Sequence, residues 1–210
     1  METIQYKSFI SLIEEIDLQK RSQRDRGTLF ELLVQAYLLN EPMYAKLYDA
    51  VWMLHDVPGE YKIPKKDTGV DLVARNEATG ELTAIQAKFY DNKIYKRHID
   101  SFLAELGKSY YSDGIIVYSL DSLSSNADEA INQLSKPVAQ IGLSDLRNSQ
   151  VDWESFIPSR PNEVKVKNVK KTRPYQNEAI DLTINYFQEH DRGQLIMAPG
   201  TGKTFTSLKL

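Results

Sequence analysis

The spacing of apolar and polar residues divides the start of the chain into two helices. Apolar residues at helical spacing predict an amphipathic helix over residues 5–18. Residues 28–39 are apolar almost all the way round, which is typical of a buried helix, and only Glu31 and Gln35, one turn apart, form a polar strip on it. The polar, basic residues 21–27 predict a connection between the two helices.

Short apolar and β-branched runs predict a sheet in the middle of the chain. Residues 69–75 and 82–90 flank a segment with Asn and Gly turn residues, which favours a β-hairpin. Further strands are predicted at 51–54, 114–120 and 137–141, helices at 97–107 and 125–134, and a loop or short strand at 58–66. Strands that alternate with helices indicate an α/β domain with a mixed central sheet flanked by helices.

The hairpin register brings polar side chains together. Side chains two apart in a strand share a face, so Gln86 and Lys88 should point the same way. If Arg75 pairs with Leu82, Asp71 lies opposite Gln86, and the three polar side chains converge; a bulge that shifts the register would separate them. A half-exposed sheet face with an Asp–Lys pair is also an ordinary structural feature, so the pattern alone leaves both interpretations open.

The composition changes from residue 158 onward. Prolines, lysines and few large apolar residues indicate a basic linker over residues 158–172. A helix over 175–189 and a strand over 194–198 then lead into a glycine-rich turn, Gly200, Thr201, Gly202, Lys203 and Thr204. In such a turn, glycines let backbone amides close on phosphates, the lysine reaches the β- and γ-phosphate oxygens, and the threonine ligates Mg²⁺.

Composition narrows the class of protein. The net charge of -3 does not indicate a generally basic nucleic-acid binder, so a DNA partner requires locally gathered positive charge, as at residues 20–26, 62–66 and 93–97. Each of these clusters alone is typical of solvated surface. The absence of cysteine excludes disulfides and Cys-ligated zinc and fits a cytoplasmic location. No apolar stretch is long enough to cross a bilayer, and the N-terminus does not resemble a signal peptide.

The hairpin sequence resembles a nuclease family. The run Gly69-Val70-Asp71-Leu72-Val73-Ala74 followed by Ile85-Gln86-Ala87-Lys88 is similar to the PD-(D/E)xK superfamily, and more narrowly to its Mrr-like branch, where the second acid is often Gln. The resemblance implies a restriction-endonuclease-like core that hydrolyses DNA with Mg²⁺. Asp71, the Gln86 amide oxygen and the Ala87 carbonyl would hold the ion, and Lys88 would orient or activate the attacking water. Because residue 86 is not acidic, a degenerate domain that does not cut stays an alternative.

Two further carboxylates near these segments each have two interpretations. In the resembled family a Glu on the first core helix can complete the metal site, which makes Glu31 a candidate catalytic residue. Thr28 to Glu31 also matches a capping box, in which the Glu bonds back to the Thr28 N–H. Asp67 is either an additional ligand or, as we favour, a loop carboxylate. His55 and His98 show no metal-ligand spacing and are interpreted as ordinary histidines.

The C-terminal segment resembles a motor protein. Arg173-Pro174-Tyr175-Gln176 is similar to the adenine-reading Gln motif of superfamily 2 helicases, and residues 200–204 are similar to their phosphate loop. The resemblance assigns ATP with Mg²⁺ to Gln176 and the loop in a longer protein, and makes residues 173–210 a truncated RecA-like segment. The second acidic motif that an ATPase needs would lie further along such a protein, so we expect no ATP hydrolysis from this chain.

The order of the segments resembles translocating restriction enzymes. A nuclease domain (1–157), a linker (158–172) and a motor segment (173–210) are arranged as in type I subunits and type ISP (LlaGI-like) restriction–modification enzymes. This implies double-stranded DNA as partner, cleavage without sequence specificity of its own, and further motor, methyltransferase and target-recognition domains. The alternatives are the nuclease of a repair helicase and a non-catalytic DNA-binding module docked on a helicase motor.

Overall fold

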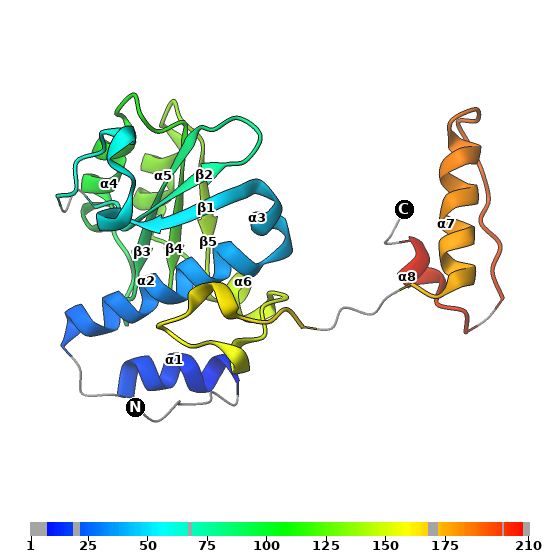
Figure 1. Ribbon diagram of the computed structural model, residues 1–210, viewed down its shortest axis with the longest axis horizontal. Helices are drawn as coiled ribbons and strands as arrows, with labels where there is room; N and C mark the ends of the chain where they lie inside the picture. Colours follow the sequence, from blue (N-terminus) through cyan, green and yellow to red (C-terminus); the bar gives the residue numbers. More distant parts are fainter. Residues whose placement is uncertain (1–7, 19–21, 67–68, 168–171, 199, 208–210) are drawn as a thin grey trace. The chain divides into compact units, whose positions relative to one another are not determined.

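The chain forms two compact units, Met1–Lys167 and Asn168–Leu210 (Figure 1). The computed structural model describes residues 8–18, 22–66, 69–167, 172–198 and 200–207. None of the helices in these ranges is long and apolar enough to span a membrane.

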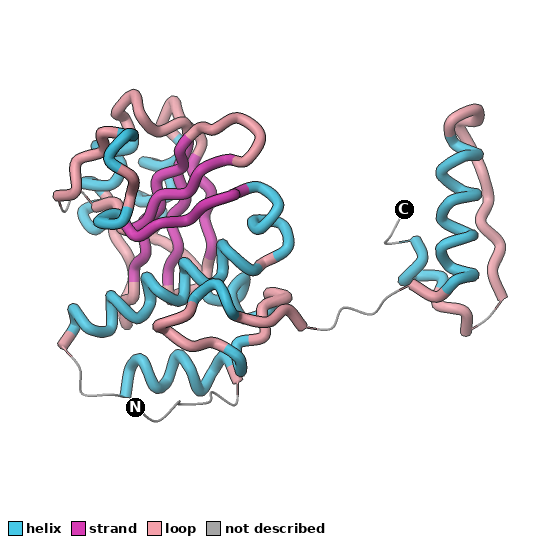
Figure 2. Tube along the Cα trace, viewed as in Figure 1, coloured by secondary structure: helices cyan, strands magenta, loops and turns pink. Residues whose placement is uncertain are grey.

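A five-stranded mixed sheet forms the centre of the first unit (Figures 1 and 2). Its strands lie in sequence order: β1 (Tyr48–Met53), β2 (Leu72–Asn76), β3 (Leu82–Lys88), β4 (Asp113–Tyr118) and β5 (Val138–Ile141). The pairs β1–β2 and β2–β3 are antiparallel, whereas β3–β4 and β4–β5 are parallel. The predicted hairpin is confirmed, and β3 is the strand at which the sheet changes from antiparallel to parallel pairing.

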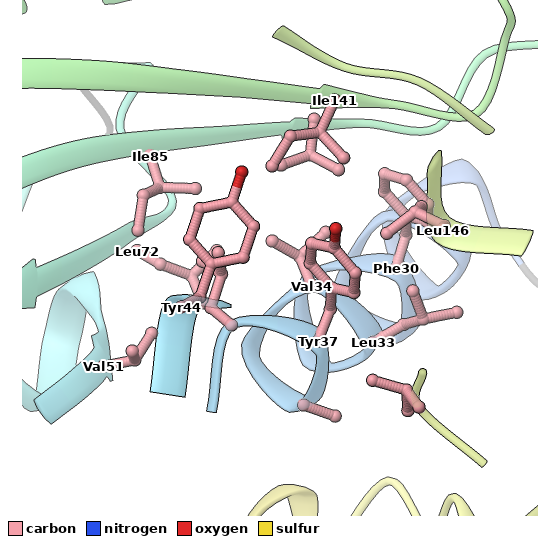
Figure 3. Packing of buried hydrophobic residues seen from close by; sticks show 14 of the residues in the cluster. Phe30, Leu33, Val34, Tyr37, Tyr44, Val51, Leu72, Ile85, Ile141 and Leu146 are labelled. Atoms are coloured by element: carbon pink, nitrogen blue, oxygen red, sulfur yellow. The ribbon is translucent and has the colours of Figure 1, made fainter. Parts of the chain in front are cut away.

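Two apolar cores cover the two faces of this sheet. Leu72 and Ala74 of β2 belong to the core beneath α1 (Phe9–Leu18), α2 (Gln23–Asn40) and α3 (Pro42–Leu47). Val73 between them belongs to the opposite core, which includes α4 (Asp100–Leu106) and α5 (Ser125–Asn132). This alternation follows from the two-residue period of a strand. Phe30, Leu33, Val34 and Tyr37 of α2 belong to the same buried cluster as Leu72 and Ile85, part of which Figure 3 shows.

The second helix begins earlier than the sequence pattern predicts. Residues 22–27 were predicted as part of a connection, but α2 starts at Gln23 and is capped by Ser22, whose side chain accepts from the Asp25 N–H while Asp25 bonds back. That prediction was wrong because a polar turn can be helical when it is capped and its side chains stay exposed. Thr28 therefore lies inside the helix, and the capping-box interpretation of Thr28 and Glu31 is also wrong.

Other predicted elements differ from the structure mainly at their ends. Residues 58–66 contain no strand and only one short turn of 3₁₀-helix, Gly59–Tyr61. Two short helices, α3 and α6 (Leu143–Asn148), had not been predicted, because six residues are too few to show a helical period. Residues 161–167 of the predicted linker belong to the first unit: Asn40 Nδ2 donates to the Pro161 carbonyl over 2.8 Å, and Val166 forms a bridge with Val151.

The second unit contains two helices and no described strand (Figure 2). The predicted helix is present as α7 (Pro174–Phe187), and α8 (Lys203–Ser207) follows the glycine-rich turn. The strand predicted at 194–198 is not formed. A strand needs a neighbour for its backbone hydrogen bonds, and the described residues of this unit provide none.

Phe30 offers a test of the core beneath α2. Its side chain is fully buried and meets Phe89 with ring centroids 5.5 Å apart. We expect Phe30→Ala to lower the free energy of unfolding by about 3–5 kcal/mol, because it removes buried surface and leaves a cavity. Met43→Ala, at a side chain 63% exposed, is the control and should change it by less than about 0.5 kcal/mol.

Urea denaturation followed by tryptophan fluorescence measures this change in the first unit, because both tryptophans, Trp52 and Trp153, lie there. Similar losses in the two variants would contradict the assignment of Phe30 to a close-packed core.

Candidate active site

The β2–β3 ladder ends beside Asp71. The predicted pair Arg75–Leu82 is present, and the register continues to Leu72–Ile85, one pair short of the predicted Asp71–Gln86 pair. The Asp71 N–H donates to the Ile85 carbonyl of β3 over 2.9 Å. The Asp71 carbonyl faces the opposite neighbour and accepts, also over 2.9 Å, from the N–H of Leu54, the residue that follows β1. In a regular strand both groups of one residue face the same neighbour. The backbone is therefore kinked at Asp71, as at a β-bulge.

The Asp71 carboxylate bonds to the backbone of β3. Its Oδ2 accepts from the Ala87 N–H over 2.7 Å. The next carbonyl along, that of Lys88, accepts from the Ser119 N–H and so faces β4. Because carbonyls alternate in direction along a strand, the Ala87 carbonyl faces the side on which the Asp71 carboxylate lies. The Asp71 carboxylate and the Ala87 carbonyl therefore lie on the same side of β3, at the point where β2 no longer pairs with it.

Gln86 is fully buried, and its two amide atoms differ in their environment. Nε2 donates to the Gly69 carbonyl over 2.7 Å. Oε1 has no hydrogen-bond partner, a property that it shares, among the buried side-chain nitrogen and oxygen atoms of the described residues, only with the Tyr111 hydroxyl. A buried acceptor without a donor is costly, and a bound cation can remove that cost.

These oxygens fit a hard divalent cation. The Asp71 carboxylate, Gln86 Oε1 and the Ala87 carbonyl are the kinds of ligand that Mg²⁺ prefers, and Mg²⁺ usually keeps several waters besides a few protein oxygens. Nowhere in the described ranges do three or more His, Cys, Asp or Glu side chains gather as a metal cluster. The chemistry of the donor set therefore suits Mg²⁺ and not a metal such as zinc.

The helix α2 runs beside this end of the sheet. Phe30 and Arg26 lie against the ring of Phe89, just beyond β3, while Gln35 donates to the Val51 carbonyl of β1 over 2.9 Å. Glu31 lies between these two contacts and is half-buried. The two residues of the predicted polar strip therefore differ in their surroundings. Gln35 bonds the helix to the edge strand β1, whereas Glu31 lies one turn nearer the end of β3. Asp67 is outside the described residues.

His98 is a neighbour of Lys88 that the sequence did not reveal. Lys88 is half-buried at the end of β3. Burial, followed by the charges of Arg97 and Lys88, lowers the pKa of His98. Its ring stacks on Tyr90 at 4.9 Å, and both ring nitrogens face N–H donors, of Tyr95 and Arg97, at 3.2 Å. A neutral imidazole has one acceptor nitrogen and can accept from one of these N–H groups at a time, whereas an imidazolium could accept from neither, so the contacts favour the neutral form of His98, as its lowered pKa does.

In the second unit, Gln176 contacts the glycine-rich turn. Gln176 is buried, and its Oε1 accepts from the Arg173 N–H over 2.8 Å, while its Nε2 donates to the Thr201 carbonyl over 2.9 Å. Gly200 and Gly202 have φ angles of 79° and 80°, which favour glycine. Lys203 and Thr204 are exposed and begin α8. The structure therefore places the two predicted motifs of this unit side by side.

Comparisons with known proteins match both units. Residues 39–163 match a family described as restriction endonuclease, and residues 169–210 match one described as Type III restriction enzyme, res subunit. No curated protein matches the chain.

The solved structures that match the chain include two restriction enzymes. The ATP-dependent Type ISP restriction-modification enzyme LlaBIII bound to DNA is 54% identical with a TM-score of 0.79, over 97% of this chain and 12% of that one. The MspJI restriction endonuclease in complex with a 27-mer oligonucleotide is 19% identical with a TM-score of 0.45, over 66% of this chain and 29% of that one. The likeness to LlaBIII confirms the predicted α/β fold, a mixed sheet flanked by helices with a helicase-like segment after it. The chain spans only a small part of the length of that relative.

The lowered pKa of His98 predicts a pH effect on stability. Since an unfolded chain protonates its histidine near pH 6.5, before the folded chain does, acid favours unfolding. We expect the free energy of unfolding to decrease as the pH falls below about 6.5 toward the lower folded-state value, and His98→Gln to lack that component of the decrease. Urea denaturation at about pH 7.5 and 5.5 measures it. His55→Gln, at an exposed imidazole, is the control, and equal pH dependence in wild type and His98→Gln would contradict the prediction.

Proposed function

Because this chain belongs to the restriction endonuclease family, whose model matches more than half of its residues, we propose that its first unit is a Mg²⁺-dependent endonuclease acting on double-stranded DNA. The observation that supports the metal is the buried Gln86 Oε1, which has no hydrogen-bond partner among the described residues, together with the Asp71 carboxylate that the backbone N–H of the next residue, Ala87, holds. The reaction we propose is hydrolysis of phosphodiester bonds without sequence specificity of its own.

The residues of the proposed site have two roles, to bind the cation and to act on the water and the phosphate. Asp71, Gln86 Oε1 and the Ala87 carbonyl would bind the cation, with Glu31 as a further carboxylate for the same site. When bound, such an ion lowers the pKa of a water and stabilises negative charge on the phosphate. Lys88 would hold the attacking water by hydrogen bonding and stabilise the charge that develops on the phosphate oxygens. The Ala87 N–H holds the Asp71 carboxylate in one orientation before DNA arrives.

We propose that the second unit is the start of an ATP-driven motor. Its match to the res subunit family and the contact between Gln176 and Thr201 support this proposal. ATP with Mg²⁺ would bind at Gln176, Gly200, Thr201, Gly202, Lys203 and Thr204. In the full protein this motor would move duplex DNA, and further motor, methyltransferase and target-recognition domains would belong to the same protein. We expect no ATP hydrolysis from these 210 residues alone, because a second acidic motif must hold Mg²⁺ and position water.

Cleavage of supercoiled plasmid in Mg²⁺ or Mn²⁺ tests the proposed nuclease. We expect the chain at high concentration to nick the plasmid, and Asp71→Ala or Lys88→Ala to lower the rate by at least about 100-fold, because the first removes a ligand of the proposed cation and the second a group that holds the water and stabilises charge on the phosphate. The matched controls Glu129→Ala and Lys108→Ala remove exposed charges of the same sign and should cleave at the wild-type rate.

The same variants decide the alternatives if the 210-residue chain does not cleave. They would then be placed in the longer protein, in which the motor delivers DNA. Cleavage that survives Asp71→Ala there would refute the proposed site. Cleavage absent from the wild-type longer protein, with DNA binding retained, would establish the non-catalytic DNA-binding module instead. A longer protein without a methyltransferase would favour a repair helicase.

A further inference from the structure

The backbone at Gly69 is fixed by the start of α4. Gly69 has a φ of +86°, which side chains rarely allow. A Cβ atom added there would lie 2.4 Å from Ser101 Oγ and 2.7 Å from the Phe102 backbone nitrogen, closer than real Cβ atoms come. The segment just before Asp71 therefore passes against the helix with no room for a side chain. Its course fixes where the Gly69 carbonyl points.

That carbonyl faces the side chain of Gln86. The Gln86 Nε2 lies 2.7 Å from the Gly69 oxygen, inside a fully buried environment. The opposite orientation of the amide would place two acceptor oxygens at that distance, so the donor must face Gly69. Oε1 is then turned away from Gly69, and it is this atom that lacks a partner among the described residues. One backbone carbonyl thus sets the orientation of both ends of the amide.

We propose that the Gly69 carbonyl is a positioning group that requires an amide, and not a carboxylate, at position 86. An ionised glutamate has two acceptor oxygens and no donor, so one of them would face the Gly69 oxygen in a buried site. The glutamine is therefore not the loss of an acid. It is the side chain that can donate to Gly69 and still present an oxygen to a cation. The part of this inference that concerns the cation rests on the proposed function, whereas the Gly69–Gln86 contact does not.

Three variants of the 210-residue chain test the contact without metal. Gln86→Glu and Gln86→Met keep nearly the same volume, but an ionised glutamate and a methionine both lack the donor to Gly69; Gln133→Glu, just beyond α5 at an exposed position, is the control. The measurement is the Tm of the first unit, followed by tryptophan fluorescence in EDTA. We expect Gln86→Met to lower the Tm by about 5 °C and Gln86→Glu to lower it further, with little change in Gln133→Glu. A wild-type Tm in Gln86→Glu would overturn the inference.

Mn²⁺ binding separates positioning from a purely structural contact. Calorimetry measures the Mn²⁺ affinity of wild type, Gln86→Glu and Gly69→Ala. The signal of Asp71→Ala, which lacks a ligand of the proposed site, is subtracted from each as background. We expect Gln86→Glu to bind Mn²⁺ no more tightly than wild type despite its additional charge, and Gly69→Ala, which keeps every proposed ligand, to bind at least tenfold more weakly. Tighter binding by Gln86→Glu, or wild-type affinity in a folded Gly69→Ala chain, would overturn the inference.

The two measurements also distinguish this inference from the proposed function. If wild type shows no Mn²⁺ binding beyond the Asp71→Ala signal, the proposed metal site fails, and the Tm values of the Gln86 variants still decide whether Gly69 requires an amide. If Gly69→Ala does not fold, the Gln86→Glu measurements decide the question alone.

Discussion

The hydrogen bond from the Ala87 N–H to the Asp71 carboxylate is the interaction on which the arrangement of the site depends. Beyond Leu72, β2 no longer pairs with β3, and the Ala87 amide would lose its partner. The carboxylate takes over that role, and a hydrogen bond to an ionised acceptor is about twice as strong as a neutral one. The side chain that completes the hydrogen bonding of β3 is therefore also a side chain of the proposed metal site.

The position of β3 within the sheet makes this arrangement rigid. It is antiparallel to β2 and parallel to β4, and its residues contribute alternately to the cores on both faces. At its end, Phe89 packs under α2 through Phe30, while Gln86 reaches the segment that lies against α4. The site thus has both helical layers as supports. Close-packed supports of this kind hold ligand oxygens in place before a ligand binds.

The sequence predicted the hairpin well because strand alternation and turn residues act over short distances. The register from Arg75–Leu82 to Leu72–Ile85 follows from them. The kink at Asp71 could not be predicted, because it depends on a hydrogen bond to Leu54, which follows β1 and lies seventeen residues earlier in the chain. The approach of Gly69 to α4 joins segments some thirty residues apart and leaves no periodic signal. The start of α2 was missed although its signal is local. The cap at Ser22 and Asp25 is short, and the polar composition of the segment favoured a connection over a helix.

The buried amide of Gln176 differs from that of Gln86 in one respect that bears on nucleotide binding. Both of its ends are already engaged, one by the Arg173 N–H and one by the Thr201 carbonyl. A base edge could bond to this amide only by displacing one of these partners. Recognition of adenine by Gln176 would then be an exchange of hydrogen bonds, with little net gain in their number. Under the proposed function, the release of Thr201 would be the means by which an occupied base site changes the glycine-rich turn that is proposed to bind the phosphates.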